Sequence, residues 1–130
     1  MTSRRRAIVG AVAVLLLGLA LGPPAPPRAH ADGFLAALDD VPLMPGLAER
    51  VEDGVSFEAA TGRIVEAVAQ GRRGPRLDRA RVVAFYGEVL PGLGWRRTGE
   101  TRFVREGEVL VLAVDETPGR VLVRFALRPR

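Results

Sequence analysis

The sequence has no cysteine, no lysine and no asparagine, and its single histidine is His30. Without cysteine the chain forms no disulfide and lacks the lipidated cysteine of a bacterial lipoprotein. Enzymes usually take acid–base groups from histidine, and nucleophiles from cysteine, lysine or a serine beside a base. Zinc, copper and haem sites also depend on histidine and cysteine. The composition therefore argues against catalysis and cofactors, and it leaves carboxylates as metal ligands, which suit Ca²⁺ or Mg²⁺.

The first 31 residues are typical of an export signal: a basic start, an apolar run at 7–22, a proline-rich break and the cleavage pattern Ala29-His30-Ala31. Cleavage after Ala31 would send residues 32–130 to the periplasm or the medium of a bacterium. The alternative is an uncleaved anchor that tethers a membrane accessory subunit, although such a helix of about 24 Å is short for a hydrocarbon core of about 30 Å. Arg5-Arg6-Ala7-Ile8-Val9 partly fits the twin-arginine pattern, so both that route and ordinary Sec export stay open.

This leader accounts for the basic charge of the chain. Four of the 19 arginines lie in it and all 15 acidic residues follow it, so the formal charge of +4 becomes zero after cleavage. A neutral exported domain is a poor candidate for nucleic-acid binding. About 100 residues form one small domain with one core.

The pattern after the leader predicts an extended lead-in, residues 32–53, and an α+β domain, residues 54–130. Strands are predicted at 55–58, 63–70, 95–98, 102–105, 109–114 and 121–128. A helix is predicted after Asp78, which is a favourable N-cap. The order β-β-α-β-β-β-β with tight turns predicts a single small domain with a mostly antiparallel sheet and the helix on one face. Residues 63–70 also suit a helix, and we choose a strand because the segment is short and bounded by glycine.

Residues 109–114 are apolar at every position, which is typical of a strand covered on both faces. The apolar residues expected on the second face, away from the helix, are Leu110, Leu112, Val114 and Leu122. We expect the lead-in to cover this face, and the alternatives are a partner protein, a second copy or a small apolar ligand. Tyr86 and Trp95 are also candidates, because Tyr and Trp are favoured in protein interfaces, although both residues would suit the core as well. The candidate interaction surface therefore consists of Tyr86, Trp95, Leu110, Leu112 and Leu122.

Five arginines lie within ten residues and form the candidate anion-binding patch: Arg72, Arg73, Arg76, Arg79 and Arg81. Such a patch suits a lipid headgroup, an acidic glycan or an acidic partner. Arg79 and Arg81 fall in the first turn of the predicted helix, where the macrodipole disfavours cations unless acidic neighbours or a bound anion offset it. The alternative is a solvated loop in an arginine-rich chain.

Acidic residues occur in two close pairs, Asp39-Asp40 and Glu106-x-Glu108. A glycosidase needs two carboxylates about 5 to 10 Å apart across a cleft, whereas adjacent acids in so small a domain are usually solvated. A hydrolase of glycans that uses carboxylates alone is therefore the weaker hypothesis. We expect Arg124 and Arg128 to pair with Glu108 or other strand acids on a solvated face.

The run Phe85-Tyr86, followed by Leu90-Pro91-x-Leu93-Gly94-Trp95 and charged hairpins, resembles a loose group of small exported bacterial proteins. Segments 41–47 and 62–64 add to the resemblance, which covers most of residues 41–128. Its motifs are structural, so the resemblance implies an α+β fold but no activity or ligand. The sequence as a whole predicts a non-catalytic, exported binding or protein-interaction module without a cofactor. Its partner would be a protein, a second copy, or an anionic lipid or glycan.

Overall fold

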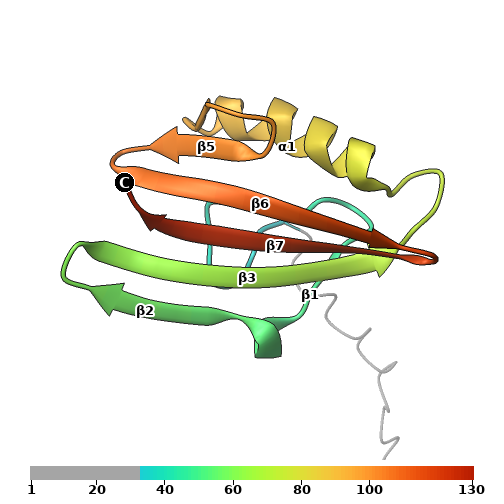
Figure 1. The fold of residues 1–130 in the computed structure, drawn as a ribbon, viewed down its shortest axis with the longest axis horizontal. Coiled ribbons are helices and arrows are strands. Elements are labelled where there is room, and N and C mark those ends of the chain that lie inside the picture. Colours follow the sequence, from blue (N-terminus) through green and yellow to red (C-terminus); the bar gives the residue numbers. More distant parts are fainter. Residues whose placement is uncertain (1–32) are drawn as a thin grey trace, which may run out of the picture.

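A computed structural model describes residues 33–130, which form a seven-stranded antiparallel sheet and one α-helix (Figure 1). The elements are β1 (Ala48–Glu49), the short 3₁₀ helix η1 (Val51–Asp53), β2 (Val55–Ala59), β3 (Gly62–Arg72), α1 (Arg79–Gly92), β4 (Arg96–Arg97), β5 (Arg102–Arg105), β6 (Glu108–Thr117) and β7 (Arg120–Pro129). Across the sheet the order is β1-β3-β7-β6-β5-β4, and β2 also pairs with β3. The predicted α+β class is confirmed, and the ambiguous segment 63–70 is part of a strand.

The leader, its cleavage site after Ala31 and the alternative of an uncleaved anchor lie outside the described residues. Within residues 33–130, no helix has the length and apolar character that crossing a bilayer would require.

Both ends of α1 follow from local sequence. The carboxylate of Asp78 accepts a hydrogen bond from the Arg81 backbone N–H at 2.8 Å, which confirms the predicted N-cap. At the other end Gly94 has φ of +90°, and the Trp95 N–H donates to the Leu90 carbonyl at 3.1 Å. This is the Schellman arrangement, in which a glycine takes the left-handed conformation that stops a helix.

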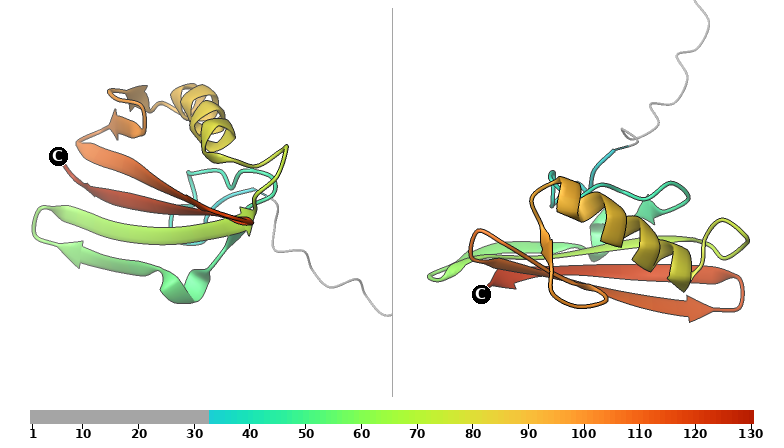
Figure 2. Two further views of the ribbon diagram at one scale, coloured as in Figure 1. Left: turned by 45° about the vertical axis from the view of Figure 1, so that its right-hand side comes forward. Right: turned by 90° about the horizontal axis from the view of Figure 1, so that it is seen from above.

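The helix and the lead-in lie on the same side of the sheet, which we call the inner face (Figure 2). Tyr86 of α1 joins the layers: its ring lies 5.3 Å from the ring of Phe125 on β7. Its hydroxyl accepts a hydrogen bond from the Met44 N–H at 3.2 Å and donates one to the Pro42 carbonyl at 2.9 Å. The expectation that the lead-in covers the second face of the sheet is therefore wrong.

The width of the sheet explains this placement. A helix about 10 Å across covers about two strands that are about 4.8 Å apart. Helix α1 packs beside β4 and β6, so the inner face over β3 and β7 needs a second cover. The lead-in supplies it with five buried apolar side chains: Leu35, Leu38, Val41, Met44 and Leu47.

Strand register corrects a second expectation. Leu110 and Leu112 pair with Leu127 and Phe125, and Val114 pairs with Val123 on the same strand. All of these residues point to the inner face, because paired residues of neighbouring strands share a face. The opposite side, which we call the outer face, is covered by neither the helix nor the lead-in among residues 33–130. Figure 1 looks onto it, with the lead-in behind the strands.

Candidate functional site

A hollow of about 800 Å³ lies where the lead-in meets the loop between β3 and α1. Its apolar lining includes Met44, Leu77 and Phe85, of which the first two are buried and Phe85 is partly buried. Three exposed arginines complete it: Arg72, Arg73 and Arg76. We call this site the arginine-rimmed hollow. A second hollow shares Met44 and Phe85 with it and continues along the lead-in.

Close backbone packing forms the hollow. Gly74 and Leu77 exchange two backbone hydrogen bonds, of 2.9 and 3.1 Å, which close a tight turn with Pro75 inside it. Leu77 from this turn and the Gly46 carbonyl from the lead-in both lie against Gly71 of β3. A Cβ atom at Gly71 would overlap both of them, so this approach requires glycine.

The structure brings together three of the five arginines in the predicted anion-binding patch. Arg73 forms an ion pair with Glu116 of β6. Arg72 and Arg76 form no salt bridge with any residue between 33 and 130. The hollow has no acidic residue in its lining, so these two guanidinium groups are available to an external anion.

The other two arginines of the patch, Arg79 and Arg81, lie in the first turn of α1 and do not line the hollow. Arg79 pairs with Glu100 at 3.0 Å, and this hydrogen bond holds the pKa of Glu100 below its ordinary value and raises that of Arg79. The Arg79 backbone N–H also donates to Glu116 at 3.4 Å. Acidic neighbours thus supply the compensation that the helix dipole requires at Arg79.

The predicted interaction surface does not form. Four of its residues are at most 3% exposed and belong to the core: Tyr86, Trp95, Leu110 and Leu112. Trp95 lies beneath the guanidinium of Arg105, whose Cζ is 4.2 Å from the ring centroid. Leu122 alone of the five lies on the outer face, opposite Gln70 and Asp115 in the register.

The expected partners of Arg124 and Arg128 are also corrected. Glu108 forms a two-point pair with Arg63, with nitrogen–oxygen distances of 2.7 and 3.2 Å. This bond raises the pKa of Arg63. Glu108 points to the inner side of β6, whereas Arg124 and Arg128 alternate to the outer side of β7, so no pair forms between them.

The acidic pairs do not converge on a cleft. Asp40 is bound to Arg105 and joins the lead-in to β5, while its neighbour Asp39 is exposed. Glu106 is exposed in the turn between β5 and β6. Each of five hollows on the described part of the chain has at most one carboxylate in its lining. The two-carboxylate geometry of a glycosidase is absent from these hollows.

Sequence reasoning found the arginines of the hollow but missed its apolar half. Met44 lies some 30 residues before the cluster, and Phe85 follows it on the helix. The signal was the apolar, proline-interrupted run at residues 41–47, whose position depends on the pairing of β1 with β3.

Comparison of the chain with protein-family models, curated proteins and solved structures gives no match.

Proposed function

We propose that this protein is a non-catalytic binding module that acts outside the cytoplasm and holds an anionic amphiphile in the arginine-rimmed hollow. One observation carries the proposal: apolar side chains and unpaired arginines line the same hollow, with no acid among them. Its volume of about 800 Å³ falls within the range of small-molecule sites. Export by the leader would place the protein where lipids and their breakdown products occur.

The chemistry of the lining defines the ligand class. Arg72 and Arg76 offer planar sets of donors that suit a carboxylate or phosphate head. Met44 and Phe85 suit an apolar chain, and the flexible thioether of methionine adapts to its shape. A polar glycan would match the arginines and leave the apolar lining without a partner.

The same residues support binding rather than catalysis. The lining contains neither a carboxylate nor a hydroxyl side chain, and the arginines remain protonated at any working pH. The only histidine of the chain lies in the leader. A bound ligand would therefore meet no acid–base group and no nucleophile in this hollow.

Titration with dodecanoate below its micelle concentration tests the proposal, with the Met44 methyl NMR signal as the readout. We expect saturable binding that shifts this signal. Replacing Arg72 and Arg76 by Gln should weaken binding about tenfold, because each removes a charge-assisted hydrogen bond. Arg81→Gln is the matched control: it also removes an exposed arginine of the predicted patch, but one outside the hollow.

Two further probes separate head from chain. Dodecanol has the chain without the charge, and it should bind more weakly and respond little to the arginine substitutions. Acetate has the charge without the chain and should not shift the Met44 signal. The proposal is wrong if dodecanoate does not saturate, or if the Arg81 variant loses as much affinity as the double variant.

A further inference from the structure

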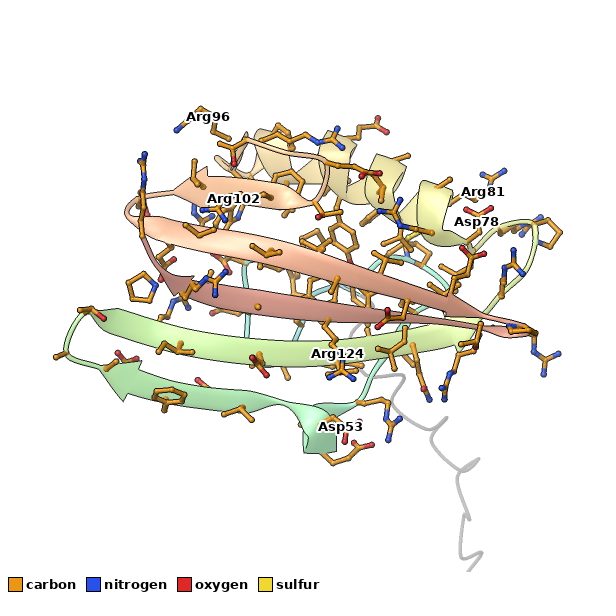
Figure 3. All side chains as sticks on the ribbon, viewed as in Figure 1. Asp53, Asp78, Arg81, Arg96, Arg102 and Arg124 are labelled. Atoms are coloured by element: carbon orange, nitrogen blue, oxygen red, sulfur yellow. The ribbon has the colours of Figure 1, made fainter. Side chains whose placement is uncertain are left out.

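The outer face of the sheet carries a second set of unpaired arginines. The strand register gives its members, because residues of one face alternate along each strand. Its six arginines are Arg72, Arg96, Arg102, Arg120, Arg124 and Arg128. Arg72 lies opposite Arg120 at the end of β3, where it also borders the arginine-rimmed hollow. Two acidic residues share the face, Glu66 and Asp115. Figure 3, seen from this side, labels Arg102 of β5 and Arg124 of β7.

The ion pairs of the described residues lie elsewhere. Three of them are on the inner side of the sheet, Arg63–Glu108, Arg73–Glu116 and Arg105–Asp40, and the others are at α1 and beside η1. None involves an arginine of the outer face within residues 33–130. Residues 33–130 hold 15 arginines and 14 acidic residues, so their charges nearly balance overall while the outer face is locally positive.

Apolar residues lie between these arginines and provide the second component. They include Val68, Val109, Val111, Ala113, Leu122 and Ala126. Val68 and Val109 are only 5% and 2% exposed, yet they stand apart from the core cluster. In the register Val68 lies beside Arg124 and Val109 beside Arg128, where the aliphatic stems of the arginines are placed to cover them.

The size of the outer face suits a protein partner. Strands β3, β6 and β7 are ten or eleven residues long, and the shorter strands β1, β2, β4 and β5 widen the sheet. At about 4.8 Å between strands and about 3.3 Å per residue the face covers about 700 Å², which approaches the about 800 Å² that one partner contributes to a standard interface. Arginine is enriched in such interfaces, and arginines are the main charged residues of this face. Most of the apolar side chains are less exposed than the arginines around them. Such a surface suits contact with a complementary protein surface better than insertion into the interior of a membrane.

Charge selects the kind of partner. A second copy would bring six arginines against six, with two acids on each side to compensate. A surface rich in Asp and Glu would instead pair with the arginines while its apolar centre covers Val111 and Ala113. We propose that the outer face docks an acidic surface of a different protein, with Arg124 near the centre of the contact.

Photo-crosslinking in the host, with the full-length protein, tests this docking. A photoreactive residue replaces Ala113, which is exposed and lies beside Arg124 in the register. The matched control replaces Ala84, which is exposed on α1. We expect a single hetero-adduct at position 113 whose crosslinked peptide is rich in Asp and Glu, and no adduct at position 84.

Charge reversal then links the adduct to the arginines. Arg102→Glu with Arg124→Glu should reduce the adduct about tenfold or more, because attraction becomes repulsion. The control pair Arg79→Glu and Arg81→Glu changes the net charge equally, on the first turn of α1 and away from the outer face, and should leave the adduct within about twofold. Circular dichroism and urea midpoints establish that both pairs remain folded.

Five results would overturn the docking of an acidic protein. An adduct of two copies would make the outer face a homodimer interface. A partner peptide without acidic residues, or an adduct that is indifferent to charge reversal, would refute the ionic contact. The absence of any adduct at position 113 would refute docking altogether. Arginine-dependent binding of the purified protein to vesicles of phosphatidylglycerol and phosphatidylcholine, without a protein adduct, would identify a membrane as the target instead.

Discussion

The two faces of this sheet are made by the same strands and differ in almost every other respect. On β7, Phe125 is fully buried against α1, while the adjacent Arg124 is exposed on the outer face. Three acidic residues on the inner side, Asp40, Glu108 and Glu116, are tied to arginines, whereas the outer arginines have no acidic partner among the described residues. Alternation along a strand identifies which residues share a face, but it does not show what covers that face.

Removal of Phe125 should produce the largest loss of stability. Phe125→Ala leaves a cavity beneath Tyr86 and should lower the free energy of unfolding by about 3 to 5 kcal/mol. Leu122→Ala, on the same strand but on the uncovered face, should cost at most about 1.5 kcal/mol. Urea denaturation measures both. Equal losses would mean that the outer face is covered as fully as the inner one.

The docking of the lead-in depends on one glycine. Gly71→Ala places a methyl group against the Gly46 carbonyl and the Leu77 side chain, so the lead-in must shift. We expect a loss of about 1 to 3 kcal/mol, together with weaker binding of dodecanoate, because the hollow is formed by these same contacts. Gly74→Ala is the control, since no atom lies within 4 Å of its Cβ position. A stable Gly71 variant with normal ligand binding would contradict this close approach.

Tyr86→Phe should loosen the contact between helix and lead-in. It leaves the Met44 N–H and the Pro42 carbonyl without their partner at a buried position. We expect the free energy of unfolding to fall by about 1 to 2 kcal/mol. Hydrogen exchange gives a second readout, because the Met44 amide should exchange faster while amides in the centre of β7 change less.

The same residue predicts a dependence on alkaline pH. Burial raises the pKa of the Tyr86 hydroxyl above its ordinary value of about 10. The stability that the neutral, hydrogen-bonded hydroxyl contributes is therefore fully present below about pH 10 and is lost as the pH rises further. The chain has no lysine, no cysteine and no other tyrosine, so few other groups obscure this titration. Urea unfolding between about pH 9 and about pH 11 should show a decline that Tyr86→Phe removes.

The fold was largely predictable because its signals are local. Alternating residues on β7, the N-cap at Asp78 and the glycine after α1 each act within a few residues of chain. The covering of the sheet was mispredicted because it is a long-range property. The apolar run of β6 has Leu110 and Leu112 on the inner face and Val109 and Val111 on the outer one, and composition alone did not distinguish a covered face from an open one.

The candidate site was half predictable for the same reason. The arginine cluster is contiguous in sequence, so it was visible, but its apolar lining comes from Met44 and Phe85 on either side of it. The expected ion pair between Glu108 and Arg124 does not form, because the two side chains point to opposite faces of the sheet. Glu108 shares the inner side with Arg63, and two strands that pair in register leave Arg124 on the other side.

The smallest expected effect gives the sharpest comparison of the two faces. Arg63→Gln removes a two-point bond to Glu108 at a partly buried position, and it should lower the free energy of unfolding by about 1 kcal/mol. Arg124→Gln removes an arginine without an acidic partner, and it should change stability by less than about 0.5 kcal/mol. Urea denaturation of both variants at low and high salt measures the difference, which salt should reduce because the Arg63 pair is partly solvated. A larger loss from Arg124→Gln would mean that this arginine stabilises the fold, whereas a neutral result is what an exposed arginine without an ion pair among residues 33–130 predicts.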